Sequence, residues 1–380
     1  LCYLISIMKK IVICGVTGNV GKQTLDVIRD NYNEYQIVGI SFHNNSTLAN
    51  QIIEEFNVPF YYCSKDNIKG NTNSFFDLIH KAKPDLVLNS LPGLAGLKAT
   101  IDAIKSKTSI ALANKESLVC CGQFVTKLAK ENNVKIIPVD SEHSAIYAII
   151  NALNVNNISD YQITITASGG PFYKVNNVDI NQKTYEQSLK NPNWNMGEKV
   201  SIDSATMLNK VFELIECYWL FNNKNVSAIC DRKSFIHGFI SNDNSCFAFK
   251  SKPDMHLPIE IALKSKTNDW NDIRQKYIIS TNINELKKEF QLENINAPSW
   301  SCYHLKDIML NDLLGPTPIV ANAADEILIN LFKNKKIRIT DFYPIILDCI
   351  NKFKNHKITS IDDVYNLHNE VQLFLNKKFN

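Results

Sequence analysis

The chain has 380 residues, which is enough for two or three domains with a sizeable hydrophobic core. Its content of 45% hydrophobic and 21% charged residues is that of an ordinary globular protein. A formal net charge of only +3 over this length argues against nucleic acid as the main partner.

The sequence opens with the apolar stretch LCYLISI before Met8. Seven residues are too few to span a bilayer, and no small-residue cleavage site follows, so we expect Met8 to be the natural start. No later apolar run reaches transmembrane length, so we expect no membrane partner. The ten cysteines contain no CxxC pair, which favours reduced thiols in a cytoplasmic protein.

Short apolar runs alternate with amphipathic segments over the first 140 residues. The runs are KIVICGV, QIVGISF, PDLVLNSL, TSIALAN and VKIIPVD, and the amphipathic segments lie at 21–30, 46–56, 96–106 and 122–132. Strand–helix repeats of this length predict an α/β fold with a doubly wound parallel sheet. In such sheets, ligands bind beyond the carboxyl ends of the strands.

The first of these units contains a glycine-rich turn. Gly15, Gly18 and Gly21 lie between a predicted strand and a predicted helix. Glycines at such a turn let the backbone approach a pyrophosphate, which then lies at the helix N-terminus. The spacing is GxxGxxG rather than GxGxxG, and a purely structural turn is the alternative. Its place in the first strand–helix unit favours dinucleotide binding.

The second strand ends in SFHNNS, where dinucleotide-binding folds contact the adenosine ribose. An acidic residue here favours a free 2′-hydroxyl, and an arginine favours a 2′-phosphate. This chain has His43, Asn44 and Asn45 instead. The absence of an acid favours NADP over NAD.

The fifth apolar run leads into DSEHS, residues 140–144. On an extended chain, Asp140 and Glu142 would point to the same side. Two carboxylates that close repel each other unless a cation or a proton lies between them. This stretch is therefore a candidate metal or acid–base site.

From about Tyr161 the pattern changes. YQITITASGGPF predicts a strand that ends in a glycine-rich loop, and a long amphipathic helix is predicted over 204–221. With SFIHGFI and SCFAFKS as further strands, this region predicts a second α/β domain. Residues 264–299 resemble a connecting segment. Helices over 321–334, 341–354 and 361–377 predict a small C-terminal bundle.

The second domain offers groups suited to a small phosphorylated substrate. Ser168 lies in the glycine-rich loop, and the Pro/Gly-containing segment 191–197 suits a mobile flap with Trp194 and Met196 as an apolar cap. On the predicted helix lie Ser204, Asn209, Lys210 and Glu213, the last three at helical spacing. The alternatives are a helix cap for Ser204, a core position for Trp194 and a surface ion pair for Lys210 and Glu213.

Taken together, these motifs resemble the 1-deoxy-D-xylulose 5-phosphate reductoisomerase family over nearly the whole chain, from about Lys10. The motifs that carry the resemblance are GVTGNVGKQTLDVI, ALANKESLV, PVDSEHSAI, ASGGPF, NWNMGEKVSIDSATMLNK followed by IE, PDM and NAADE. The resemblance implies an enzyme that rearranges 1-deoxy-D-xylulose 5-phosphate and reduces it with NADPH to 2-C-methyl-D-erythritol 4-phosphate, in non-mevalonate isoprenoid biosynthesis.

The resemblance also implies a role for each matching residue. The metal ligands would be Asp140, Glu142 and Glu213, holding Mg²⁺ or Mn²⁺. The substrate would be bound by Ser141, Ser168, Asn191, Ser204, Asn209 and Lys210. The cofactor would contact Thr17, Gly18, Asn19, Val20, Gly21, Asn45, Asn114, Lys115, Glu116 and Gly197. The catalytic residues would be Lys115, Glu142, His143 and Trp194. For His143, the alternative is that it donates a hydrogen bond that orients Glu142.

The implied organisation is an NADPH-binding domain over 1–150, a catalytic domain over 151–263 with a flap over 190–198, a linker over 264–299 and a C-terminal helical domain over 300–380. The resemblance further implies a homodimer. In the implied mechanism, the C3–C4 bond breaks to an enolate and an aldehyde, these recombine in the branched skeleton, and NADPH reduces the new aldehyde.

Three segments depart from the family pattern. Asn191 stands where the family has the histidine of a His-Pro pair, and residues 231–234 read Asp-Arg-Lys-Ser instead of His-Pro-Gln-Ser. Residues 43–45 read His-Asn-Asn instead of Gly-Arg/Lys-Asn, so the basic partner for a 2′-phosphate is missing. The rival hypotheses are a metal-free two-domain NADP-dependent dehydrogenase and a non-catalytic nucleotide-binding protein.

Overall fold

The computed structural model describes residues 8–65, 70–194, 196–295 and 298–379. The opening stretch LCYLISI, and with it the expectation about the natural start, lies outside the described residues. The chain forms two compact units. Unit 1 comprises Leu1–Ser117, Val125–Ser144 and Asp254–Asn268, and unit 2 comprises Leu118–Phe124, Ala145–Pro253 and Asp269–Asn380.

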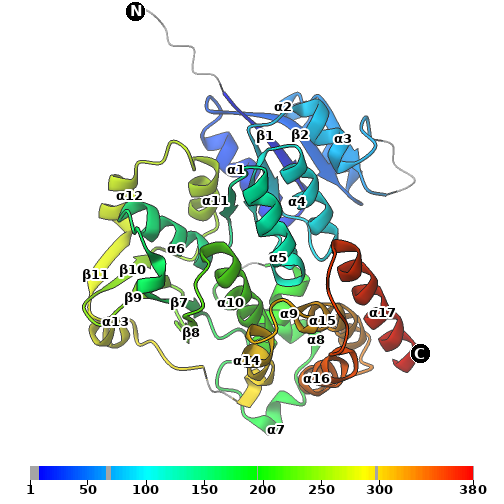
Figure 1. Cartoon of the computed structure of the whole chain (residues 1–380), viewed down its shortest axis with the longest axis vertical. Helices are drawn as coiled ribbons and strands as arrows, with labels where there is room; N and C mark the ends of the chain where they lie inside the picture. Colours follow the sequence, from blue (N-terminus) through cyan, green and yellow to red (C-terminus); the bar gives the residue numbers. More distant parts are fainter. Residues whose placement is uncertain (1–7, 66–69, 195, 296–297, 380) are drawn as a thin grey trace, which may run out of the picture. The chain divides into compact units, whose positions relative to one another are not determined.

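Unit 1 is built on a six-stranded parallel sheet, with its strands in blue to green in Figure 1. Its strands are β1 (Lys9–Cys14), β2 (Tyr35–Phe42), β3 (Phe60–Cys63), β4 (Leu86–Asn89), β5 (Ser109–Leu112) and β6 (Ile136–Pro138). Their order in the sheet is β3-β2-β1-β4-β5-β6, the arrangement of dinucleotide-binding folds. The predicted doubly wound sheet is confirmed. The sequence pattern missed β3 because it is four residues long and mostly half-buried.

A helix follows each strand of this sheet, and four of these helices overlap the predicted amphipathic segments: α1 (Asn19–Asp30), α2 (Ser46–Phe56), α4 (Ala95–Lys105) and α5 (Glu116–Glu131). The other two, α3 (Phe75–Ala82) and α6 (Ser141–Ala152), were not predicted, and most of α6 belongs to unit 2. A later helix, α11 (His256–Leu263), packs against α1 and β6. The centre of the unit is β1, where Ile11, Val12 and Ile13 are fully buried.

Unit 2 contains a mixed five-stranded sheet. Its strands are β7 (Gln162–Ala167), β8 (Val226–Cys230), β9 (Ile236–Ser241), β10 (Cys246–Lys250) and β11 (Ile278–Thr281), in the order β11-β10-β9-β7-β8. Only the β7–β8 pair is parallel among these described strands. Helix α13 (Ile283–Phe290) contributes Leu286 to the apolar cluster beside Ile236 and Phe239. The sequence pattern did not identify β8 or β11, which are short and largely half-buried.

The predicted helix over 204–221 is wrong as a single element. The structure has α9 (Glu198–Thr206) and α10 (Leu208–Phe221), separated at Met207, whose φ of 66° is left-handed. The Met207 side chain is buried in a cluster with Ala167 and Trp300, which offsets the cost of that backbone conformation. The break places Ser204 in the last turn of α9 and Asn209 in the first turn of α10.

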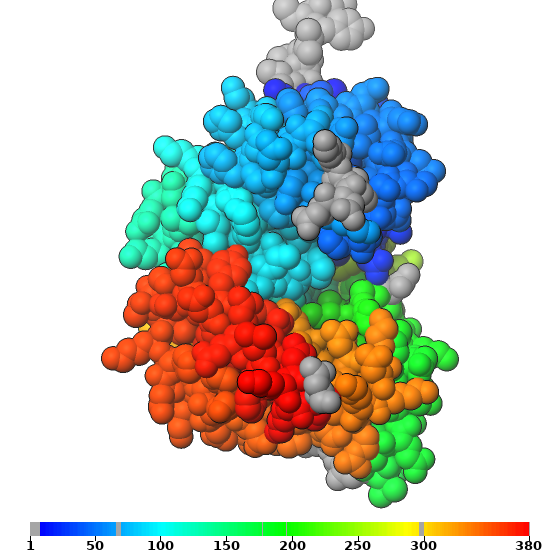
Figure 2. Space-filling model, turned by 90° about the vertical axis from the view of Figure 1, so that its right-hand side faces the viewer, coloured from blue at the N-terminus to red at the C-terminus, as the bar shows by residue number. Residues whose placement is uncertain are grey.

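The C-terminal helices form the predicted bundle, which Figure 2 shows as one continuous block of orange-to-red side chains. They are α15 (Thr317–Lys333), α16 (Phe342–Phe353) and α17 (Ile361–Phe379), and α15 packs against both of the others. The remaining elements are η1 (Ile158–Asp160), α7 (Asn177–Ile180), α8 (Tyr185–Ser188), α12 (Trp270–Tyr277), η2 (Pro298–His304), α14 (Leu305–Leu310) and η3 (Ile339–Asp341). Among the described residues, none of the helices combines the length and apolar character that crossing a membrane requires.

Candidate functional site

The glycine-rich turn joins β1 to α1 and packs tightly. Gly15 has a φ of +84°, which favours glycine, and Gly18 caps the N-terminus of α1. A Cβ on Gly21 would lie 2.4 Å from the carbonyl oxygen of Gly15, so only glycine lets α1 approach the turn this closely. Thr17, Asn19 and Val20 complete the turn. The helix N-terminus therefore opens directly beyond the carboxyl end of β1, where a pyrophosphate would be bound.

The segment after β2 is held by its own side chains. The Oδ1 atom of Asn45 accepts a hydrogen bond of 3.1 Å from the Leu48 amide and so caps α2. The His43 ring lies 2.9 Å from the hydroxyl of Ser64, which follows β3. His43, Asn44 and Asn45 are all exposed at the carboxyl edge of the sheet.

Asn114 locks two loops together where β4 and β5 end. Its buried amide donates to the carbonyls of Leu91 and Gly93 at 2.8 and 2.9 Å and to the Glu116 carboxylate at 2.8 Å. Its Oδ1 atom accepts from the Ser117 amide at 3.0 Å. This network fixes the start of α5 and with it the direction in which Lys115 leaves the sheet.

Lys115 reaches the acidic stretch that follows β6. Its ammonium lies 2.9 Å from the Asp140 carboxylate, and both side chains are largely buried. Ser141 donates a hydrogen bond of 2.5 Å to Glu142. Carboxylate oxygens of Asp140 and Glu142 approach within 4.8 Å, and a ring nitrogen of the fully buried His143 lies within the same distance of Asp140.

The local conformation of this stretch differs from the extended one assumed from the sequence. Strand β6 ends at Pro138, and α6 begins at Ser141, so Glu142 is in the first helical turn. The two carboxylates converge because a tight strand-to-helix turn brings them together, not because of strand alternation. A helix N-terminus also stabilises an acidic side chain in its first turn.

In unit 2, the polar residues at the start of α10 form a buried cluster. Asn209 donates to Glu213 at 2.5 Å, and Lys210 pairs with the other oxygen of the same carboxylate. The side chains of Lys210 and Glu213 are only 4% and 2% exposed, so the alternative of a surface ion pair is wrong. Removing one partner of such a pair leaves an uncompensated buried charge, at a cost of about 3–5 kcal/mol.

The glycine-rich loop after β7 is held by Arg232, which lies in one of the segments that depart from the family pattern. The Arg232 guanidinium donates hydrogen bonds of 2.8 Å to the carbonyls of both Ser168 and Gly170 and lies 4.8 Å from the Tyr173 ring centroid. The buried Asp231 carboxylate accepts from three backbone amides that follow it. The Asp-Arg-Lys-Ser sequence is thus a self-capped turn that supports the Ser168 loop.

The predicted flap begins with a turn made by Asn191. Its Oδ1 atom accepts from the amides of Asn193 and Trp194 at 3.0 and 3.1 Å. Its Nδ2 atom is buried and has no hydrogen-bond partner among the described residues. Trp194 is half-buried against His237, at 6.0 Å between ring centroids, so it is not a core residue. Burial lowers the pKa of His237 to about 4, which keeps this ring neutral.

The flap ends at Gly197, which caps α9, and Met196 before it is half-buried. No heavy atom lies within 4 Å of a Cβ built on Gly197, so steric fit alone does not require glycine there. Seven residues further on, Ser204 offers its carbonyl to the Met207 amide at 3.3 Å, at the end of α9. The alternative that Ser204 caps the predicted helix is therefore wrong.

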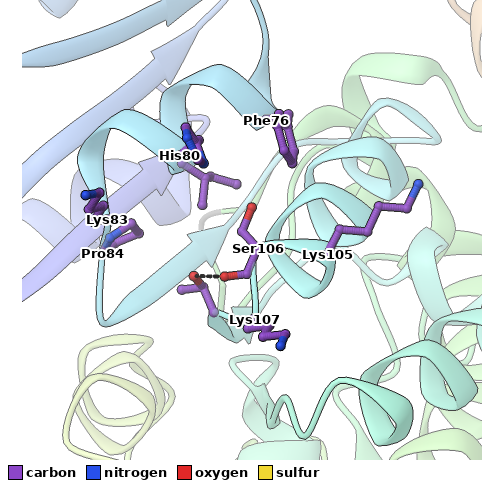
Figure 3. Close-up of a pocket in the computed structure, with 9 residues that line it drawn as sticks. Phe76, His80, Lys83, Pro84, Lys105, Ser106 and Lys107 are labelled. Carbon is purple, nitrogen blue, oxygen red and sulfur yellow. Dashed lines mark hydrogen bonds between the residues drawn. The ribbon is translucent and has the colours of Figure 1, made fainter.

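A separate pocket of about 350 Å³ lies in unit 1, where Figure 3 shows Lys83, Lys105 and Lys107 around it. It is lined by Phe76, Ile79, His80, Lys83, Pro84, Lys105, Ser106, Lys107 and Thr108. Most of these residues immediately precede β4 and β5 or end α3. The pocket therefore opens at the amino ends of the strands, opposite to the edge where such sheets bind ligands.

Three family models match the chain. The model described as 1-deoxy-D-xylulose 5-phosphate reductoisomerase matches residues 11–122, and the model of its C-terminal domain matches residues 136–221. A model described as DXP reductoisomerase C-terminal domain matches residues 251–374.

Relatives and solved structures cover almost the whole chain. The 1-deoxy-D-xylulose 5-phosphate reductoisomerase of Malacoplasma penetrans (strain HF-2) is 38% identical over 371 residues, which are 97% of this chain and 94% of that protein. The enzyme of Clostridium perfringens (strain 13 / Type A) is 37% identical over an alignment 398 residues long, which covers 98% of this chain and 100% of that protein. A DOX-P reductoisomerase crystallised with NADPH, fosmidomycin and magnesium matches with a TM-score of 0.85 and 27% identity over 98% of both chains. The enzyme from Zymomonas mobilis with NADPH matches at 0.78, with 27% identity over 98% of this chain and 99% of that one.

The contacts of Arg232 generate a prediction about stability. Arg232→Ala removes two charged hydrogen bonds and should lower the free energy of unfolding by about 1–3 kcal/mol, measured by urea denaturation. The neighbouring exposed Lys233→Ala should change it by less than about 0.5 kcal/mol. Equal effects of the two substitutions would show that Arg232 does not support the loop.

Proposed function

The chain belongs to the 1-deoxy-D-xylulose 5-phosphate reductoisomerase family, and on that premise we propose which of its residues carry the reaction. It is an NADPH-dependent enzyme that converts 1-deoxy-D-xylulose 5-phosphate into 2-C-methyl-D-erythritol 4-phosphate. The observation that carries the site assignment is the paired Asp140 and Glu142 beside Lys115, beyond the carboxyl end of β6.

We assign the divalent cation to Asp140 and Glu142 of unit 1 and Glu213 of unit 2. The donor set fits such an ion, because three carboxylates offer hard oxygen ligands for Mg²⁺ or Mn²⁺. The close approach of Asp140 to Glu142 supports the assignment, since a doubly charged ion removes their repulsion. Magnesium in the similar DOX-P reductoisomerase structure with NADPH and fosmidomycin supports it further.

The substrate phosphate is assigned to the polar groups of unit 2 and Ser141. Lys210 supplies the positive charge, and Ser168, Ser204 and Asn209 supply neutral donors. The assignment of Asn191 to the phosphate site is supported by the hydrogen bonds of its side chain. Its carbonyl oxygen is committed to the turn, while its buried Nδ2 atom remains available to donate to an anion.

The catalytic roles follow from these positions. When bound, the cation polarises the ketose carbonyl and its neighbouring hydroxyl, and NADPH supplies the reducing equivalent. Lys115 places a positive charge beside Asp140, where negative charge develops in the enolate stage of the rearrangement. Trp194 closes over the substrate and excludes water, which keeps the fragments together. His143, buried behind Asp140, orients the acidic pair.

The cofactor assignment rests on unit 1. The turn over residues 17–21 holds the pyrophosphate, and Asn114, Lys115 and Glu116 lie beyond β5 where the nicotinamide half would reach. Asn45 already caps α2, and the exposed segment over residues 43–45 presents His43 and neutral amides rather than an arginine or lysine to the 2′-phosphate. We propose a weaker preference for NADPH over NADH than a basic residue in this segment would give.

We further propose a homodimer and a cytoplasmic location. The nine cysteines of the described residues are all buried, and the sequence contains no CxxC pair, which fits a reducing compartment. The division into domains over 1–150, 151–263 and 300–380 with a linker over 264–299 also remains a proposal. Within that linker range lie α12, β11 and α13, and β11 pairs with β10.

The metal assignment predicts the behaviour of Glu213→Gln. The substitution removes one anionic ligand and should lower kcat by about two orders of magnitude or more, while the Kd for NADPH stays unchanged. The matched control is Glu289→Gln on the exposed face of α13. Wild-type activity should also be lost with a chelator and restored by Mn²⁺, which a metal-free dehydrogenase would not show. Normal turnover of Glu213→Gln would refute the ligand assignment.

The free amide of Asn191 predicts opposite effects of two substitutions. Asn191→Asp keeps the acceptor that forms the turn but replaces the donor by a negative oxygen, so the KM for the ketose phosphate should rise at least about tenfold. Asn191→His adds a group able to carry positive charge and should lower the KM. Steady-state kinetics at saturating NADPH measures both. An unchanged KM in both variants would mean that the position does not contact the phosphate.

A further inference from the structure

A buried ionic cluster in unit 2 takes no part in the assignments above. Lys199 of α9 lies 2.7 Å from the Asp203 carboxylate on the same helix and 2.5 Å from the Asp325 carboxylate of α15. The two aspartate side chains are 1% and 0% exposed, and Lys199 is 16% exposed. One ammonium therefore faces two carboxylates in the interior of the unit.

The remaining oxygens of the two carboxylates show that the negative charge of the cluster exceeds its positive charge if both acids are ionised. The Oδ1 atoms of Asp203 and Asp325 are both buried and accept no hydrogen bond from the described residues. Two ionised carboxylates with a single cation would leave an uncompensated negative charge where water does not screen it. One proton shared between the carboxylates removes that charge. Burial and the neighbouring Asp325 carboxylate raise the pKa of Asp203 to about 8, which agrees with a retained proton at neutral pH.

The cluster lies where the flap meets the C-terminal helices. Helix α9 begins at Glu198, directly after its cap Gly197 in the predicted flap, and ends with the turn that carries Ser204. Helix α15 contains Asp325 and packs against α9. An exposed pair between Glu198 and Lys333, 3.0 Å apart, joins the same two helices at the surface.

We propose that Asp203 and Asp325 share one proton and that the resulting neutral cluster with Lys199 positions α9, so that Ser204 and the flap can engage the substrate phosphate. These are positioning residues, since they act through α9 rather than by touching the substrate. The inference rests on the proposed phosphate site.

Other titratable groups around the cluster keep their states at neutral pH. Burial raises the pKa of the Cys302 thiol in η2, so this group stays neutral. Glu326 on α15 is also buried, but its contact with His368 of α17, at 3.2 Å, holds the pKa of its carboxyl below the usual value. The Phe212 ring of α10 lies 5.1 Å from the Lys199 ammonium and stabilises its charge. The shared proton is therefore the group that titrates here at mildly alkaline pH.

The sign of the pH effect follows from the raised pKa of Asp203. The folded protein holds this proton more tightly than the unfolded chain, so its contribution to stability is full below the ordinary carboxyl pKa and is lost as pH rises to about 8. Above that pH the two carboxylates repel each other within the cluster. The contact of α9 with α15 through this cluster should weaken, and the KM for the ketose phosphate should rise.

The first test compares substitutions of Asp325 by kinetics. Asp325→Asn mimics the protonated acid, because its amide can donate to Asp203 while its carbonyl accepts from Lys199. We expect its KM for the ketose phosphate to match the wild type at pH 7 within about twofold and to lack the rise, about fivefold, that the wild type shows by pH 9. Asp325→Ala should raise the KM at both pH values. Lys333→Met, which breaks the exposed pair between the same helices, should keep the wild-type profile.

The second test records the proton without substrate. The infrared spectrum of the free enzyme should contain the carbonyl stretch of a protonated carboxylic acid at pH 7, and the band should fade towards pH 9 and be missing in Asp325→Asn. A wild-type spectrum without that band overturns the shared proton. A band together with identical pH profiles of KM in wild type and Asp325→Asn overturns the positioning role. A wrong phosphate site would show separately, as an unchanged KM in Asn191→Asp.

Discussion

The repulsion between two neighbouring carboxylates is the constraint on which the site depends. Asp140 and Glu142 are brought together by a turn of two residues between β6 and α6. That turn itself contains no positively charged side chain to offset the two carboxylates. Lys115 reaches Asp140 from the end of β5, where Asn114 fixes the loop that carries it. The parallel sheet matters because it places both segments at its carboxyl edge, the same edge at which the nucleotide turn follows β1. The proposed divalent cation would supply the positive charge that Lys115 alone does not provide.

Unit 2 also contains buried carboxylates, and other groups compensate their charge there. The buried Glu213 carboxylate is contacted by the Asn209 amide and the Lys210 ammonium, which compensate the cost of burying it. In the second cluster, the single positive charge of Lys199 cannot compensate the negative charges of both Asp203 and Asp325, and the proposed shared proton takes the place of a second cation. One departure from the family pattern also acts through contacts between residues distant in sequence. Arg232 supports the Ser168 loop through the backbone, which the family's His-Pro-Gln-Ser pattern would have to achieve otherwise.

The sequence was sufficient for the features that repeat at short range. Periodic apolar runs identified five of the six strands of the parallel sheet, and the amphipathic segments matched their helices. It failed where tertiary packing decides the local structure. Met207 breaks a continuous helical pattern because its side chain is buried beside Trp300, and β11 forms because β10 offers an edge for pairing. The resemblance named Asp140, Glu142 and Glu213, but the support by Arg232 and the Lys199 cluster depend on contacts between distant residues that no local pattern reveals.

The central claim is that carboxylates from both units bind one divalent cation. Crystals of the enzyme grown with Mn²⁺, and measured at a wavelength where manganese scatters anomalously, test it most directly. We predict a single anomalous peak coordinated at about 2.2 Å by oxygens of Asp140, Glu142 and Glu213. A manganese peak that contacts the unit 1 pair without Glu213, or that lies away from all three carboxylates, would contradict the account.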